Sequence, residues 1–252
     1  MPSNNHHSRF AAIPSFDLST WTDIWKQHPI QENYDPLIDI RDHHKSIHYT
    51  PMYHTLKITG AITGCYVRKS LFSKLIVAAD ILQSLQPNYS FLVYDAWRPE
   101  TVQQSLFDDY KLSVSQQYPA KTELECVTLT EQFVSLASTN PTKPSPHITG
   151  GSIDLTILDT NGTPLNMGTH FDDFTNKAHT DFFEDSLNKN DTDGIKENRR
   201  LLYQVMTQAG FTNFPFEWWH FDYGNQFWAS LSKQPYAFYG PTNPGKTFIT
   251  SN

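Results

Sequence analysis

Two short segments far apart in the chain constrain the fold most, because together they carry the side chains of one metal site. The first, Ser145 to Asp154, contains a histidine and an aspartate seven positions apart, His147 and Asp154. The second, Glu217-Trp-Trp-His220, contains a histidine with a carboxylate three positions before it. Two imidazoles and one carboxylate suit a catalytic zinc site that leaves one position for water, and the spare carboxylate suits a general base. The pairing indicates a zinc hydrolase whose fold brings both segments together.

Each segment alone also has a simpler explanation. A chain with 11 histidines contains several such His-Asp pairs, so His147 and Asp154 could be an exposed histidine and an ordinary strand residue. Against this, Gly150-Gly151 allows a tight reversal between them, and Asp154 interrupts a strand pattern that favours aliphatic residues. The two tryptophans of the second segment suit a core, which leaves Glu217 and His220 unexplained, because buried ionisable groups are costly unless paired or metal-bound.

The hydrophobic pattern predicts helices and strands in an irregular order. Helices are expected over 69–86, 100–117, roughly 130–138 and 196–209, and strands over 90–97, 152–158 and 216–223. Alternation along 152–158 puts Asp154 on the face opposite three aliphatic residues. In an ideal strand Glu217 and His220 would point to opposite faces, so a bulge, or a position of Glu217 just before the strand, is needed.

Strands separated by unequal segments favour an α+β fold: a single compact domain with a small antiparallel sheet flanked by helices. We expect residues 1–45 to form an irregular N-terminal extension packed on the domain, residues 46–235 to form the domain, and residues 236–252 to form a tail.

Arg98 follows the strand over 90–97 and precedes Pro99. It suits equally a salt bridge with Asp95 and a fixed cation aimed at an oxyanion.

Composition excludes several other classes of protein. The net charge is −7, from 19 basic and 26 acidic residues without a dense Lys/Arg run, so nucleic-acid binding is not expected. Neither a signal peptide nor an apolar stretch of ~20 residues is present, which predicts no membrane partner and a cytoplasmic location, with a periplasmic one left open. Cys65 and Cys126 suit two free buried thiols, and a single disulfide is the alternative.

Six motifs in order resemble the D-alanyl-D-alanine dipeptidase family of zinc peptidases (VanX-type, peptidase family M15). The likeness covers roughly residues 48 to 232, and the motifs are Asp95-Ala-Trp-Arg-Pro99, Ser145-x-His147-x-x-Gly150-x-x-x-Asp154, Met167-Gly-Thr-x-Phe-Asp172, Ala178-His-Thr-Asp181, Asn198-Arg-x-Leu-Leu202 and Glu217-Trp-Trp-His-Phe-Asp-Tyr-Gly224. The fold that this resemblance implies is shared with D,D-carboxypeptidases and the Hedgehog signalling domain.

The resemblance also implies an activity: zinc-dependent hydrolysis of the dipeptide D-Ala-D-Ala to two D-alanines, in which a glutamate-activated, zinc-bound water attacks the peptide carbonyl. By motif position, one Zn²⁺ per chain is bound by His147, Asp154 and His220. Glu217 matches the family's catalytic base, and Arg98 matches the arginine that stabilises the tetrahedral intermediate. Two further positions lie near the substrate, Ser145 and Asp172, the latter facing its free ammonium group.

The chain departs from the family pattern at two places. Ser152 replaces the usual alanine, a small change expected to be harmless, and Lys57-Ile-Thr-Gly60 stands where the family carries Asn-Phe-x-Gly, which helps to shape the substrate pocket. The nearest alternative function is a D,D-carboxypeptidase or endopeptidase acting on longer peptidoglycan peptides. An alternative of another class is an inactive zinc-bearing binding protein, which would need neither Glu217 nor Arg98.

Overall fold

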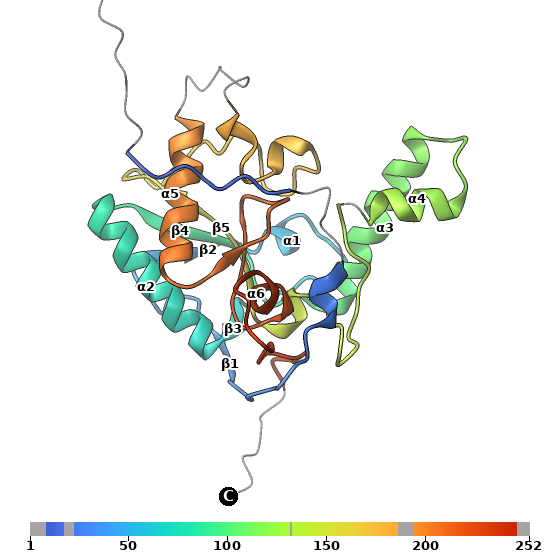
Figure 1. Cartoon of the computed structure of the whole chain (residues 1–252), viewed down its shortest axis with the longest axis horizontal. Coiled ribbons are helices and arrows are strands. Elements are labelled where there is room, and N and C mark those ends of the chain that lie inside the picture. The colour runs from blue at the N-terminus through green and yellow to red at the C-terminus, as the bar shows by residue number, and fades with distance from the viewer. Residues whose placement is uncertain (1–8, 18–22, 132, 186–193, 246–252) are drawn as a thin grey trace, which may run out of the picture.

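The computed structural model describes residues 9–17, 23–131, 133–185 and 194–245 (Figure 1). A five-stranded sheet forms its centre. The strand order is β2-β4-β5-β7-β6, with bounds Ile47–Tyr49, Ser90–Asp95, Ser152–Leu158, His220–Asp222 and Thr212–Asn213. Strands β2 and β4 are parallel, and the other neighbours are antiparallel. A second, two-stranded antiparallel sheet joins β1 (Leu37–Asp39) to β3 (Tyr66–Arg68).

Two long helices, α2 (Lys69–Leu85) and α5 (Ile195–Gln208), lie side by side against the sheet (Figure 1). Both carry apolar residues at helical spacing, and these residues are buried together with the aliphatic face of β5. That face consists of Ile153, Leu155 and Ile157, each 0% exposed. Because each fully buried aliphatic side chain contributes about 1.5–3 kcal/mol, this layer holds β5 and its neighbours in place.

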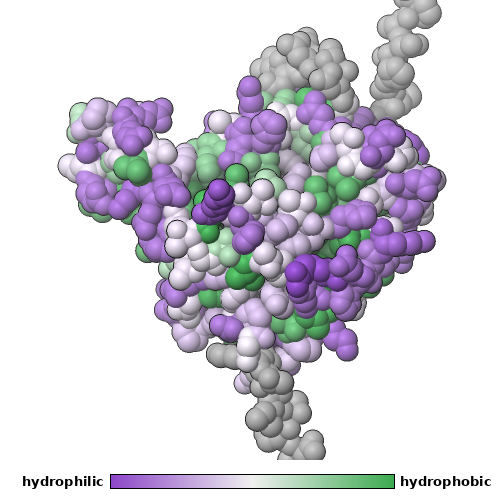
Figure 2. Space-filling model, turned by 180° about the vertical axis from the view of Figure 1, so that it is seen from behind, coloured by the Kyte–Doolittle hydropathy of each residue, from purple (hydrophilic) through white to green (hydrophobic). Residues whose placement is uncertain are grey.

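The remaining helices are α1 (Met52–Thr55), α3 (Glu100–Gln117), α4 (Glu123–Thr130) and α6 (Gln226–Leu231), with 3₁₀ turns at Asp23–Gln27, His147–Thr149, Asn176–Ala178 and Phe182–Glu184. Helices α3 and α4 pack on each other and project from the body as a lobe (Figures 1 and 2). In the view of Figure 2 the surface mixes polar and apolar side chains. Within the described part of the chain, no helix combines the length and the apolar character that a membrane span requires.

The predicted α+β class is confirmed, and the predicted helices and strands over 69–86, 100–117, 152–158 and 196–209 match α2, α3, β5 and α5 closely. The helix expected over 130–138 is wrong. Helix α4 begins earlier because Thr122 and Glu125 form a capping box, and it ends at Thr130. The strand expected over 216–223 shortens to β7, and β1 and β2 were too short to show a pattern.

A buried arginine ties three segments together. Arg68, which is 0% exposed, donates hydrogen bonds from Nε to Thr149 O (2.8 Å) and from Nη1 to Asp35 O (2.6 Å). Its Nη2 donates to Glu32 Oε2 and to Gly240 O, both at 3.0 Å. The segment before β1, the turn before β5 and the segment after α6 therefore share one anchor.

The division into an extension (1–45), a domain (46–235) and a tail (236–252) stays a proposal. Residues 1–8 and 18–22 of that extension, residues 246–252 of that tail and residues 186–193 lie outside the described residues. Within the described extension, Phe10 and Ile13 are buried, and Leu37–Asp39 supplies a strand.

The prediction of two free, buried thiols is confirmed for Cys65 and Cys126.

Candidate active site

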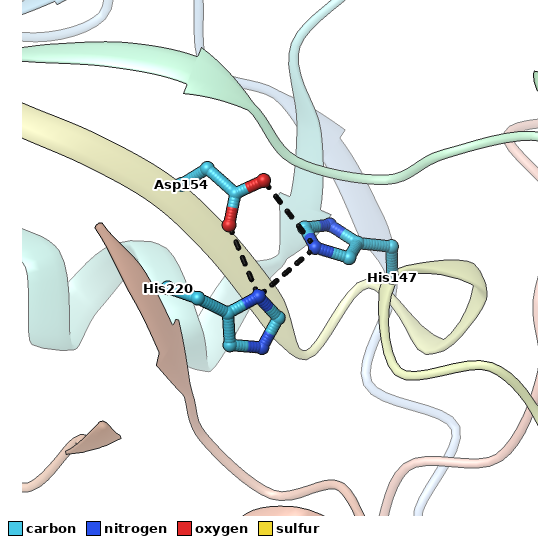
Figure 3. Close-up of side chains that lie close together, drawn as sticks. All are labelled: His147, Asp154 and His220. Carbon is cyan, nitrogen blue, oxygen red and sulfur yellow. Dashed lines mark hydrogen bonds and ion pairs between the residues drawn. The ribbon is translucent and has the colours of Figure 1, made fainter. Parts of the chain in front are cut away.

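Three predicted ligand side chains meet at the sheet. The antiparallel pairing of β5 with β7 sets Asp154 directly opposite His220. His147 begins the 3₁₀ turn before β5, and the chain then reverses through Gly150, whose φ of +69° lies in the left-handed region. A Cβ at Gly150 would lie 2.5 Å from Leu37 Cδ2, so any other residue would strain the backbone and force that side chain to shift. Figure 3 shows the three side chains converging.

The converging atoms are two ring nitrogens and a carboxylate. His147 Nε2 lies 3.2 Å from His220 Nδ1 and 3.5 Å from Asp154 Oδ2, and His220 Nδ1 lies 3.0 Å from Asp154 Oδ1. All three residues are buried, and their ligand atoms lie within 4.8 Å of one another. Although it is close to His220, the buried Oδ1 of Asp154 forms no hydrogen bond of acceptable geometry. A cluster of unshared electron pairs in this arrangement can hold a metal ion.

The other ring nitrogen of each histidine is occupied by a partner outside the cluster. His147 Nδ1 lies 2.7 Å from Ala96 O, and since a carbonyl only accepts, Nδ1 carries the proton and Nε2 keeps its lone pair. Burial, reinforced by the positive charge of Arg98, lowers the pKa of His147 well below its ordinary value and favours the neutral ring. His220 Nε2 lies 3.1 Å from both carboxylate oxygens of Asp222. Such partners on the far side of the ring are typical of metal-binding histidines.

Glu217 lies in a turn just before β7. This is one of the two arrangements, a bulge or a position before the strand, that would let Glu217 and His220 reach the same site. Its N–H donates to Phe214 O at 3.0 Å, and its carbonyl accepts from the His220 N–H at 3.3 Å. The turn brings Glu217 Oε2 to 3.8 Å from His220 Nδ1. Burial raises the pKa of Glu217 to about 8, and the negative charges of Asp154 and Asp172 act in the same direction. The Glu217 side chain is 21% exposed and lines the cavity.

Arg98 lies three residues after the end of β4 and is fixed by several hydrogen bonds. Its Nε donates to Asp95 Oδ2 and its Nη1 donates to Gln103 Oε1, both at 2.8 Å. Its Nη2 donates to the Tyr53 hydroxyl at 3.1 Å and to Asp154 Oδ2 at 3.2 Å. Arg98 therefore forms the salt bridge with Asp95 and also lies beside the cluster of candidate metal ligands.

Asp172 lies in the same cavity. Tyr53 accepts from Arg98 and donates its own hydroxyl hydrogen to Asp172 Oδ1 at 3.2 Å. Burial raises the pKa of Asp172 to about 7. Its φ of +58° lies in the left-handed region, which aspartate adopts more readily than most residues with a side chain.

Ser145 lies on the wall of this cavity, and its Oγ accepts the Ser138 N–H at 2.9 Å. Aromatic side chains form much of the remaining lining, namely Phe133, Phe174, Phe214 and Phe227. The structure thus brings all seven predicted site residues to one place, with Asp154 behind the cavity wall.

Sequence reasoning missed three residues that hold this site: Tyr53, Gln103 and Asp222. Asp222 follows His220 by two positions and therefore shares a strand face with it, a signal that period-2 spacing offered. Gln103 follows Arg98 by five residues, on the first turns of α3. Tyr53 lies in the short helix α1 and carried no signal.

Comparisons with known proteins agree on a family. The family model described as D-ala-D-ala dipeptidase matches residues 52–238. A D-alanyl-D-alanine dipeptidase of Synechocystis sp. is 29% identical over 196 residues, which cover 69% of this chain and 78% of the relative. The D-alanyl-D-alanine dipeptidase of Escherichia coli K12 is 28% identical over 158 residues, covering 63% and 66% of the two chains.

Two solved structures overlap with most of the chain at low sequence identity. The vancomycin-resistance D,D-pentapeptidase VanY in complex with zinc is 15% identical, with a TM-score of 0.46 over 84% of this chain and 92% of that one. The LdcB LD-carboxypeptidase is 19% identical, with a TM-score of 0.43 over 82% and 77%. The family match alone spans about three quarters of the sequence and confirms the resemblance of the six motifs. The chain belongs to the D-Ala-D-Ala dipeptidase family, peptidase family M15, and is a metallopeptidase.

Proposed function

We propose that the protein hydrolyses D-Ala-D-Ala to two D-alanines, using one Zn²⁺ bound by His147, Asp154 and His220. The observation that carries this proposal is the convergence of three ligand atoms within 4.8 Å, with Glu217 and Arg98 beside them. The curated relatives at 28–29% identity are named for the same dipeptide.

The donor set suits zinc. Two imidazole nitrogens and one carboxylate match the three-ligand composition of catalytic zinc sites. The unsatisfied Oδ1 of Asp154 is an acceptor that would otherwise remain buried without a partner, at a cost of about 1–3 kcal/mol. Zinc bound here would acidify a water molecule toward a pKa of about 7 and polarise the peptide carbonyl.

Glu217 is the proposed general base and acid. Its carboxyl group faces the cavity beside the ligand cluster, and its raised pKa makes it a stronger base than an exposed glutamate. We assign it the transfer of a proton from the attacking water to the amine that leaves when the peptide bond breaks.

Arg98 is the proposed oxyanion donor. Its guanidinium is held on three sides before any substrate arrives, so little reorganisation is needed when negative charge develops on the carbonyl oxygen. The same geometry fixes the distance between the positive charge and the ligand carboxylate of Asp154.

Asp172 is the proposed partner of the substrate's free ammonium group. Its carboxyl group, buried beside Tyr53 and Arg98, faces the cavity and would pair with the positively charged end of the substrate. Ser145 borders the same cavity and is the proposed second contact with the dipeptide.

A second candidate function is the trimming of longer peptides. A second cavity adjoins the first and shares the lining residues Glu131, Ser135, Ser145 and Pro146 with it. Space that continues past Ser145 could accommodate residues beyond a dipeptide.

The deciding experiment measures D-alanine release by the zinc-loaded protein from D-Ala-D-Ala, N-acetyl-D-Ala-D-Ala and L-Ala-L-Ala. Cleavage restricted to the free D,D-dipeptide, and abolished by Glu217→Ala, is the expected result. Preferred cleavage of the acetylated substrate would instead establish a D,D-carboxypeptidase. Zinc binding at one ion per chain without any cleavage would overturn both assignments and leave a binding protein.

A further inference from the structure

The second residue pair of the β5–β7 ladder lies directly behind the ligand pair. In that ladder Asp154 is opposite His220, and two residues further along Ser152 is opposite Asp222. Because side chains two apart on a strand share a face, all four side chains lie on one face of the sheet. Ser152 and Asp222 are both 0% exposed, and Asn225, at the start of α6, is 1% exposed.

These buried groups form a closed set of hydrogen bonds. Ser152 Oγ donates to Asp222 Oδ1 at 2.6 Å, and Asn225 Nδ2 donates to the same oxygen at 2.6 Å. Asn225 Nδ2 also lies 2.9 Å from Ser152 Oγ, which accepts from it. Asp222 therefore receives two short hydrogen bonds on one oxygen, while both of its oxygens lie 3.1 Å from His220 Nε2.

The direction of these hydrogen bonds is set from outside the site. Asn225 is the N-cap of α6, and its Oδ1 accepts the Trp228 N–H at 3.0 Å. That contact fixes which end of the amide is oxygen, so the NH₂ group must face Ser152 and Asp222. The serine hydroxyl accepts a hydrogen bond from the amide and donates one to the carboxylate.

These hydrogen bonds determine which tautomer His220 adopts. The carboxylate of Asp222 accepts hydrogen bonds from Ser152 and Asn225 and presents oxygen acceptors to His220 Nε2 at 3.1 Å, so Nε2 is the nitrogen that carries a hydrogen and donates to it. The lone pair of His220 is then on Nδ1, the nitrogen that faces His147 and Asp154.

We propose that Ser152, Asp222 and Asn225 are positioning residues that hold His220 as its Nε2–H tautomer, with Nδ1 directed at the metal. The inference rests on the proposed function to the extent that His220 is a zinc ligand. It assigns Ser152 a function, although its replacement of alanine looked harmless from the sequence. Partners that orient a metal-binding histidine typically contribute 10–100-fold in metal affinity.

The test compares zinc dissociation constants of the full chain, measured by competition with a chromophoric chelator, among three variants. Asp222→Asn should weaken zinc binding by about 10–100-fold, because a neutral amide holds the ring less firmly. Ser152→Ala should weaken it by a smaller factor, since Asn225 still donates to Asp222. Thr156→Val is the matched control. Thr156 is buried on the same face of β5, and its hydroxyl makes no hydrogen bond to Ser152, Asp222 or Asn225. The zinc affinity of this variant should therefore equal that of the parent protein.

A second readout separates positioning from general damage to the fold. The visible absorption spectrum of the Co²⁺-loaded protein reports ligand geometry, and it should change in Asp222→Asn and Ser152→Ala but not in Thr156→Val. Unchanged affinity and an unchanged spectrum in Asp222→Asn would overturn the proposal; if that variant does not fold, the same two results in Ser152→Ala would overturn it. Absence of zinc binding by the parent protein would instead refute the proposed function.

Discussion

Replacement of Arg98 by methionine tests the catalytic assignment most directly. Methionine keeps much of the length of the side chain and removes the four hydrogen bonds to Asp95, Gln103, Tyr53 and Asp154. Two effects follow from the structure, one on stability and one on catalysis, and they can be measured separately.

The stability effect comes from Asp95, whose buried carboxylate loses its charged partner. Loss of one member of a buried ion pair costs about 3–5 kcal/mol. The catalytic effect comes from the missing oxyanion donor. By comparison with other preorganised donors, we expect kcat to fall about 10²–10³-fold, which corresponds to about 2.7–4 kcal/mol.

The measurements are steady-state hydrolysis of D-Ala-D-Ala at full zinc occupancy and urea unfolding of the same samples. Arg200→Met serves as the control, because Arg200 also pairs with a carboxylate, Glu184 at 2.7 Å, but does not line the cavity. It should lower stability and leave kcat unchanged. A kcat of Arg98→Met close to the parent value, with zinc bound, would refute the role assigned to Arg98.

Further outcomes follow from the same structure. Glu217→Gln should lower kcat by about 10²–10⁴-fold without loss of zinc, as shown by kinetics and metal analysis of the same preparation. Asp172→Asn should raise KM more than it lowers kcat, and the opposite pattern would argue against contact with the ammonium group. Removal of zinc by a chelator should lower the melting temperature, because zinc at about 1,000 times its Kd stabilises the folded state by about 4 kcal/mol; equal melting temperatures would contradict the site. Burial alone would raise the pKa of Glu184, but hydrogen bonds from Arg200 outweigh this effect and hold that pKa below its ordinary value. The stability that Glu184 contributes should therefore be present above the unfolded-state pKa of 4.5 and be lost as pH falls through the lower folded-state pKa, so in urea titrations the difference from Glu184→Gln should shrink in acid.

Much of the architecture is encoded in local patterns. The apolar spacing before Pro87 predicted α2, and the alternation around Asp154 predicted β5, because burial on one face imposes the period of each element. Glu217 and His220 needed a turn before a strand, and that turn is present. What local patterns could not predict is which strand lies beside which, since pairing depends on contacts distant in sequence.

The missed residues illustrate that limit. Tyr53 reaches Arg98 and Asp172 across 45 and 119 positions of sequence, and no spacing rule spans such distances. The wrong prediction of a helix over 130–138 has a different cause, because here a local signal was present. Thr122 and Glu125 form a capping box, which marks the start of α4, and the apolar pattern alone did not reveal it.

The anchor at Arg68 bears on how this protein tolerates change at its ends. Segments near chain termini usually accept trimming and fusion with little penalty. Here Asp35 and Gly240 are bound to the guanidinium that also holds Thr149, two residues from His147. A deletion reaching either segment would leave a buried cation short of acceptors beside the turn that carries the proposed metal ligand His147. Shortened versions of this enzyme should therefore lose metal retention before they lose their helices.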